Sequence, residues 1–160
     1  TPEMIKRANL NKAELCFENI EFKLGDIENL PLEDDMSNVV VSNCVLNLVP
    51  DKAKAFSEIY RILKPGGHFC VSDIVLEGEI PSSLKKSAEM YAGCVSGALQ
   101  KDEYLNIINQ AGFSDVEIKN SREIILPQDI LKSYLDDDQF EKYNKSGLGI
   151  YSMTVVAAKN

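Results

Sequence analysis

Apolar and polar residues alternate in blocks along the chain, and the period of the alternation changes from block to block. Residues 20–24 (IEFKL) alternate apolar and charged side chains, which predicts a strand with one buried face. Residues 39–41 are three valines, which predict a strand buried on both faces, as in a parallel sheet covered by helices. The segments 68–75 and 150–159 also predict strands.

Helical spacing separates these strands. Thr1-Pro2-Glu3 provides a hydroxyl cap, a proline in the first turn and an acid near the positive helix end, so a helix is expected to about Leu15. Asp51 can cap a second helix, whose apolar residues continue at helical spacing to Leu63 before the turn sequence KPGG. Further helices are expected from Pro81 to about residues 94–97 and at 103–111, 127–135 and 138–143, and strands at 115–119 and 123–126.

The alternation of strands and helices predicts an α/β fold in a single domain over residues 1–160, a Rossmann-like three-layer sandwich with a mostly parallel sheet. The strand pair expected after Gly112 predicts an antiparallel edge. The sequence contains no repeat, low-complexity segment or interdomain linker.

Composition narrows the function classes. The formal charge of −8 disfavours binding to a phosphate backbone, so nucleic acid is not an expected partner. No apolar run approaches the roughly 18 residues of a membrane span, so no membrane is expected and the cytoplasm is the expected location. The 4 cysteines contain no CxxC spacing, so we expect reduced thiols and neither a zinc site nor a disulfide framework.

The strand at 39–41 ends in Ser42, Asn43 and Cys44, where an apolar continuation would be ordinary. Ligands of open parallel sheets bind outside the carboxyl ends of the strands. Taken alone, Cys44 has two interpretations: a small buried thiol, or a ligand for a soft substrate. Cys94 favours the second, because it lies between Gly93 and Gly97 in a segment that can fold over the same edge.

Two longer stretches resemble a known family. GDIENLPLEDDMSNVVVSN and AFSEIYRILKPGG are similar to the middle of class I S-adenosylmethionine-dependent methyltransferases, and SNCVLNLVPDK and YAGCVSGAL resemble the cysteine-bearing segments of arsenite methyltransferases. The resemblance implies that Cys44 and Cys94 are the catalytic residues and together hold arsenic(III). It also implies S-adenosylmethionine as cofactor, arsenite or its thiol conjugates as substrate, and a thiol reductant as partner.

The resemblance implies a cofactor-binding surface as well. Asp26 or Glu28 would accept a hydrogen bond from the adenine amino group, and the backbone near Ile27 would meet the ring. Ser42 and Asn43 would face the polar part of the cofactor. The choice between the two acids stays open.

The chain also departs from the family. It contains no Gly-rich GxGxxG-like turn, so we expect a partial methyltransferase domain that lacks the first two strands and is not competent alone. The missing strands would leave an exposed sheet edge through which the chain could self-associate. Two alternatives remain: a small-molecule C-methyltransferase of the quinone-ring type, and a non-catalytic domain that binds arsenic through thiols.

Overall fold

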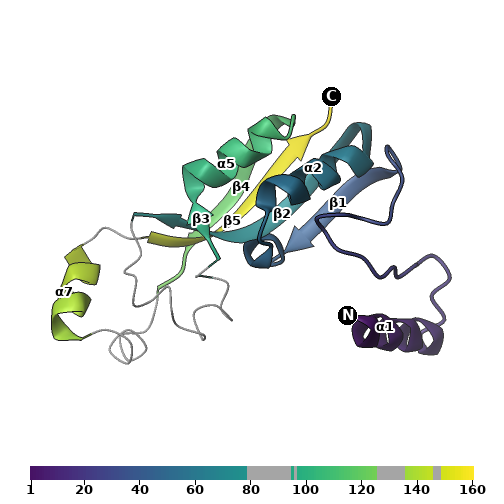
Figure 1. The fold of residues 1–160 in the computed structure, drawn as a ribbon, viewed down its shortest axis with the longest axis horizontal. Helices are drawn as coiled ribbons and strands as arrows, with labels where there is room; N and C mark the ends of the chain where they lie inside the picture. The colour runs from purple at the N-terminus through teal and green to yellow at the C-terminus, as the bar shows by residue number, and fades with distance from the viewer. Residues whose placement is uncertain (79–94, 96, 126–135, 146–148) are drawn as a thin grey trace.

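The computed structural model describes residues 1–78, 95, 97–125, 136–145 and 149–160 (Figure 1). Its helices are α1 (Pro2–Glu14), the short 3-10 helix η1 (Leu46–Leu48), α2 (Lys52–Ile62), α5 (Lys101–Gln110) and α7 (Asp137–Lys145). Its strands are β1 (Ser37–Asn43), β2 (Leu63–Glu77), β3 (Leu99–Gln100), β4 (Ser114–Glu123) and β5 (Gly149–Ala158). The helix expected at 127–135 and most of the one expected after Pro81 lie outside the described residues.

The strands form one mixed sheet in the order β1-β2-β5-β4. β1 is parallel to β2, whereas β5 is antiparallel to both β2 and β4. The short strand β3 pairs with β2 in parallel, beginning at Val75. The predicted α/β class is therefore confirmed. The sheet has an antiparallel edge, but β4 forms it with β5 and not with a second strand at 123–126.

Two of the helices begin as predicted. Thr1 Oγ1 accepts a hydrogen bond from Met4 N–H at 3.3 Å at the start of α1. Asp51 Oδ1 accepts one from Lys54 N–H at 2.9 Å at the start of α2. Each cap satisfies a backbone donor that the first turn of a helix leaves unpaired. Within the described part of the chain, no helix combines the length and the apolar character needed to cross a membrane.

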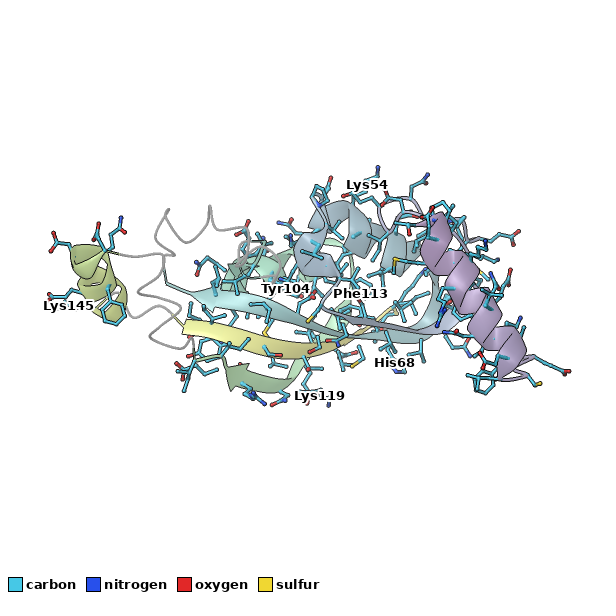
Figure 2. The ribbon with its side chains drawn as sticks, turned by 90° about the horizontal axis from the view of Figure 1, so that it is seen from below. Lys54, His68, Tyr104, Phe113, Lys119 and Lys145 are labelled. Carbon is cyan, nitrogen blue, oxygen red and sulfur yellow. The ribbon has the colours of Figure 1, made fainter. Side chains whose placement is uncertain are left out.

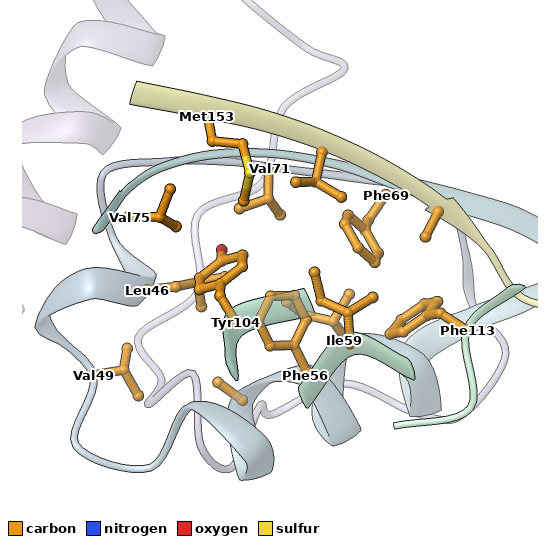
Figure 3. Packing of buried hydrophobic residues seen from close by; sticks show 14 of the residues in the cluster. Leu46, Val49, Phe56, Ile59, Phe69, Val71, Val75, Tyr104, Phe113 and Met153 are labelled. Carbon is orange, nitrogen blue, oxygen red and sulfur yellow. The ribbon is translucent and has the colours of Figure 1, made fainter. Parts of the chain in front are cut away.

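The core lies between the sheet and the helices α2 and α5 (Figure 3). The ring of Phe56 from α2 packs against Phe69 of β2 at a centroid distance of 5.7 Å. It also meets Tyr104 of α5 edge to face at 5.5 Å. All three side chains are fully buried, so these aromatic contacts join both helices to the sheet.

Residues 20–24 do not form the predicted strand. Phe22 and Leu24 remain 38% and 56% exposed, and no described strand pairs with this segment. Alternation of side chains specifies only the faces of a strand, whereas its backbone groups need a neighbouring strand to pair with.

The strand β1 forms as predicted, but its expected burial on both faces is wrong. Val39 and Val41 are 47% and 74% exposed, whereas Val40, on the other face, packs against the core. The reason is that α2 and α5 cover one face of the sheet and β1 lies at its end. Among the described helices α1 covers nothing here, since none of its residues is buried and a long connection separates it from the sheet (Figure 1).

The sequence KPGG does not end a helix in the predicted way. The helix α2 already stops at Ile62, and Leu63 is a fully buried residue of β2. Opposite β1 the paired residues jump from Leu63 to His68, so the intervening KPGG residues bulge out of the ladder, with Gly66 at a φ of 80°. The strand predicted at 123–126 is also wrong in its described part, because β4 ends at Glu123.

Replacement of Phe56 by alanine tests this core. We expect the Phe56→Ala variant to lose roughly 3–5 kcal/mol of unfolding free energy, because a buried ring that joins both helices to the sheet leaves a cavity. Urea denaturation measures the change. The matched control is Phe17→Ala, whose ring is half-exposed and whose loss should stay within about 0.5 kcal/mol. Equal losses in the two variants would contradict this description of the core.

Candidate functional site

The carboxyl end of β1 places Cys44 where the sheet stops. The last paired residues of the ladder are Asn43 and Ser72, and the next amide, Cys44 N–H, donates to Ser72 O at 2.8 Å. Cys44 is exposed and has a φ of 54°, a left-handed conformation that is uncommon outside glycine. The chain therefore turns sharply at the predicted thiol. Asn43 is exposed beside it, whereas the Ser42 hydroxyl is buried and makes no hydrogen bond within the described residues.

The loop predicted to meet adenine lies at the same end of the sheet. Glu28 Oε1 accepts a hydrogen bond from Asp51 N–H at 3.0 Å, which attaches the loop to the start of α2. Asp26 Oδ1 accepts one from Glu28 N–H at 2.9 Å and so closes a tight turn, with Ile27 packed against the core. Of the two acids, Asp26 is the exposed one.

Arg61 of α2 anchors the remainder of this loop. Its guanidinium donates to Leu32 O at 2.8 Å and to Asp34 Oδ1 at 2.7 Å. It also pairs with Glu58 at 2.7 Å, and Glu58 in turn accepts from Leu30 N–H at 2.8 Å. The hydrogen bond from Arg61 is the main reason that the pKa of Glu58 is lowered. One arginine thus fixes the path of a loop that has little secondary structure of its own.

The segment that follows the second predicted thiol comes to the same place. Cys94 itself lies outside the described residues, but Val95 is buried in a small apolar cluster with Ile74 and Leu76 of β2 and Ile150 of β5. Gly97 lies directly on η1: a Cβ atom at this position would stand 2.2 Å from Asn47 O. Only glycine permits this approach of two backbones. The structure therefore brings residue 97 against the turn that begins at Cys44.

A buried polar cluster lies beneath this turn. Tyr104 Oη donates to Asp73 Oδ2 at 2.8 Å, and Lys52 Nζ donates to Asn47 O and Val49 O at 3.2 and 3.0 Å. Burial raises the pKa of Asp73 to about 6, outweighing the opposing effects of the Tyr104 hydroxyl, the Asn47 backbone and the Lys52 ammonium. Burial also lowers the pKa of Lys52. In Figure 3 the hydroxyl of Tyr104 points towards the sheet.

Three other candidate groups lie elsewhere. Cys16 is exposed just beyond α1, and Cys70 is partly buried within β2. His68 lies at the opposite end of the β1–β2 pairing from Asn43. Figure 2 shows it on the side of the sheet away from Tyr104.

The site residues predicted from the sequence include none of Asn47, Lys52, Arg61 and Tyr104. Asn47 carried a signal, because it is a polar residue within the apolar run VLNLV and is 1% exposed in the fold. Buried polar side chains require partners, so such a residue marks a specific hydrogen-bonding arrangement. Nothing in the sequence distinguishes Lys52 or Tyr104 from ordinary residues of amphipathic helices.

Residues 1–112 match the model of a protein family described as "Methyltransferase domain". The chain belongs to this methyltransferase family. It is 44% identical over 118 residues to an arsenite methyltransferase of Halobacterium salinarum, covering 74% of this chain and 30% of that protein. It is 34% identical over 127 residues to an arsenite methyltransferase of Aquipseudomonas alcaligenes, covering 78% of this chain and 37% of that protein.

A solved structure extends the similarity to the fold. The crystal structure of an arsenic(III) S-adenosylmethionine methyltransferase from Chlamydomonas reinhardtii superposes with a TM-score of 0.71 at 32% identity, covering 88% of this chain and 44% of that one. The predicted Rossmann-like class I methyltransferase fold and the resemblance to arsenite methyltransferases are thus confirmed. The chain spans about a third of the length of the curated relatives it matches.

The raised pKa of Asp73 predicts a dependence of stability on pH. Folding favours the neutral acid, so its contribution is complete below a pH of about 4 and is lost as the pH rises through about 6. The ionised form costs the folded state about 3 kcal/mol by pH 8. About half of this cost already applies at pH 5, so between pH 5 and pH 8 we expect the unfolding free energy of Asp73→Asn to rise relative to that of the parent by about 1.4 kcal/mol.

Urea denaturation across this pH range measures the difference. The exposed Asp138 provides the control, because Asp138→Asn should follow the parent at every pH. A constant difference between Asp73→Asn and the parent would show that Asp73 is already ionised at pH 5 in the folded chain.

Proposed function

We propose that this chain carries the arsenic-binding part of an arsenite S-adenosylmethionine methyltransferase, with Cys44 and Cys94 as the two thiolate ligands of the substrate. The observation that carries the proposal is the close packing of Gly97 on Asn47. Asn47 lies three residues after Cys44 and Gly97 lies three residues after Cys94, so this packing brings the two cysteine-bearing segments together. Thiolates are the ligands that soft centres such as arsenic(III) prefer.

The chemistry fits a site without a general base. Arsenic(III) held by two thiolates keeps a lone pair, and this electron pair is what a methyl acceptor needs. No proton has to leave the substrate, so the protein contributes by holding the arsenic in the correct orientation. Arsenic that has given up its lone pair needs two electrons to become trivalent again, and we propose a thiol reductant as their source.

S-adenosylmethionine would supply an electrophilic methyl group when bound. The residues present fit the adenine side of this cofactor: Asp26 is exposed in a loop fixed to α2, and Asn43 is exposed at the end of β1. Of the two acids considered, we propose Asp26 for the adenine amino group, because Glu28 lies partly buried against Asp51. The backbone of Ile27 would contact the adenine ring. Ser42, whose hydroxyl is buried, and Asn43 would face the polar part of the cofactor. No Gly-rich turn for the methionine part is present, so we expect this chain to bind arsenite without methylating it.

We also propose that the chain is cytoplasmic and that it self-associates through a sheet edge. Arsenic binding requires reduced thiols, which the cytoplasm maintains. Among the described strands β1 has a neighbour on one side only, and an unpaired strand edge can pair with a second copy of the chain.

Single replacements of the two cysteines test the function. We expect Cys44→Ser and Cys94→Ser each to weaken arsenite binding by at least about tenfold, because chelation loses its advantage when one arm is removed. Anaerobic titration calorimetry of the purified chain, with a phosphine as reductant, measures the affinity. Cys16→Ser and Cys70→Ser are the matched controls and should bind like the parent. Unchanged affinity in Cys44→Ser or Cys94→Ser would exclude the two-thiol site.

Alanine at position 97 tests the juxtaposition that carries the proposal. Because the added Cβ would lie 2.2 Å from Asn47 O, the two segments must separate, and we expect arsenite affinity to fall by about tenfold. The control is Gly66→Ala. Gly66 has a φ of 80° and open space around it, so this variant should cost about 1 kcal/mol of stability without changing affinity. Equal affinities of the two variants would argue against convergence at Gly97.

A further inference from the structure

The edge of β2 that faces β1 is completed by successive partners from different segments. The strand β1 pairs with it as far as Ser72. The strand β3 pairs with it again from Val75. Between them the backbone of Ile74 is paired by a side chain: Asn47 Oδ1 accepts from Ile74 N–H at 2.8 Å, and Asn47 Nδ2 donates to Ile74 O at 2.7 Å. The amide of Asn47 thus fills the gap in the ladder.

This arrangement reproduces the pattern of a strand. A side-chain amide presents one acceptor and one donor in a plane, as a strand residue does towards its neighbour. Asn47 is 1% exposed, so both of its groups are withdrawn from water and depend on Ile74 for their hydrogen bonds. Loss of either bond would leave a buried backbone group of Ile74 unpaired, which destabilises the fold.

Cys44 lies between the end of the β1 ladder and this side-chain rung. Its amide is tied to Ser72 O on one side, and three residues later the chain is tied to Ile74 through Asn47. Its φ of 54° is a left-handed conformation that is unfavourable for a non-glycine residue. Such conformations persist when the surroundings fix both ends of the segment.

The backbone carbonyl of Asn47 has partners as well. Lys52 Nζ donates to Asn47 O at 3.2 Å from a buried position. Gly97 packs against the same oxygen. One residue therefore ties the turn after Cys44 to β2 through its side chain and supports the approach of Gly97 through its backbone.

We propose that Asn47 is the positioning residue for Cys44: its amide, by replacing one rung of the sheet, fixes where the thiol stands relative to the segment at Gly97. The inference rests on the proposed function in one respect, namely that Cys44 binds arsenic. The order of the turn can be measured without arsenic.

Asn47→Ala is the direct test, with Phe113→Leu as the control. Phe113 packs against Phe69 at a centroid distance of 4.7 Å, and Figure 3 shows it at the opposite end of the core from Leu46. Both variants destabilise the fold, but only Asn47→Ala removes the rung. Each protein is studied as the full chain, well below its unfolding midpoint.

Amide hydrogen exchange followed by NMR reports the order of the turn. In Asn47→Ala we expect the Cys44 and Ile74 amides to exchange at least about tenfold faster, while the Phe69 amide keeps its protection. Arsenite affinity, measured by calorimetry, should fall by about tenfold. In Phe113→Leu both the local exchange and the affinity should match the parent.

Asn47→Asp adds a rescue that a general loss of stability would not show. A neutral carboxylic acid carries one donor and one acceptor and can make both bonds to Ile74, whereas a carboxylate can only accept. Complete burial at position 47 favours the neutral form of the introduced acid. Relative to the parent at each pH, we therefore expect Asn47→Asp to show protected Cys44 and Ile74 amides at about pH 5 and to lose this protection at about pH 8. This variant keeps the test decisive if Asn47→Ala fails to fold.

The possible outcomes separate the two claims. Parent-like exchange at Cys44 in Asn47→Ala overturns the positioning role, and so does an equal effect of Phe113→Leu. Faster exchange with unchanged arsenite affinity overturns it too, because the order of the turn would then have no effect on arsenic binding by the thiol. If the parent chain does not bind arsenite but exchange still rises in Asn47→Ala, the proposed function fails while Asn47 retains its role in ordering the Cys44 turn.

Discussion

The organising constraint of this chain is that the buried edge of β2 must have a hydrogen-bond partner along its length. The β2 residues from Asp73 to Leu76 are buried, and an unpaired backbone group in a buried position costs about as much as a lost hydrogen bond. The strand β1, the amide of Asn47 and the short strand β3 supply the partners in turn. The strand β1 ends immediately before Cys44, Asn47 lies three residues after it, and β3 follows Cys94 in the sequence, so pairing this one strand edge also brings the two cysteine-bearing segments together.

The buried polar cluster of Asp73, Tyr104, Asn47 and Lys52 beneath the Cys44 turn lowers the stability of the fold. Asp73 is 1% exposed and accepts a hydrogen bond from Tyr104, and burial raises the pKa of its carboxyl to about 6 despite that hydrogen bond. A core of apolar residues alone would be cheaper to bury. Buried ionisable groups and left-handed non-glycine residues often accumulate at functional sites, where geometry is retained at the expense of stability. Cys44 and Asp73 follow that pattern here.

Much of the fold was predictable from the sequence. The caps at Thr1 and Asp51, the strand ending at Asn43 and the helix before Gly112 are local features, set by spacing and by side chains that bond to nearby backbone. The predictions that were wrong concern neighbours. Residues 20–24 alternate correctly but pair with no described strand, and Val41 is apolar but exposed because no described helix covers that face of β1.

The candidate site likewise combines features that single residues set and features that depend on neighbouring segments. The sequence by itself determined the residue types that the chemistry requires: the thiols Cys44 and Cys94, the acids Asp26 and Glu28, and the polar end of a valine strand. Only the tertiary structure decided that Gly97 packs on Asn47 and that Ile74 is paired by a side chain. Side-chain chemistry is a property of single residues, whereas a shared strand edge exists only after segments distant in the sequence have paired.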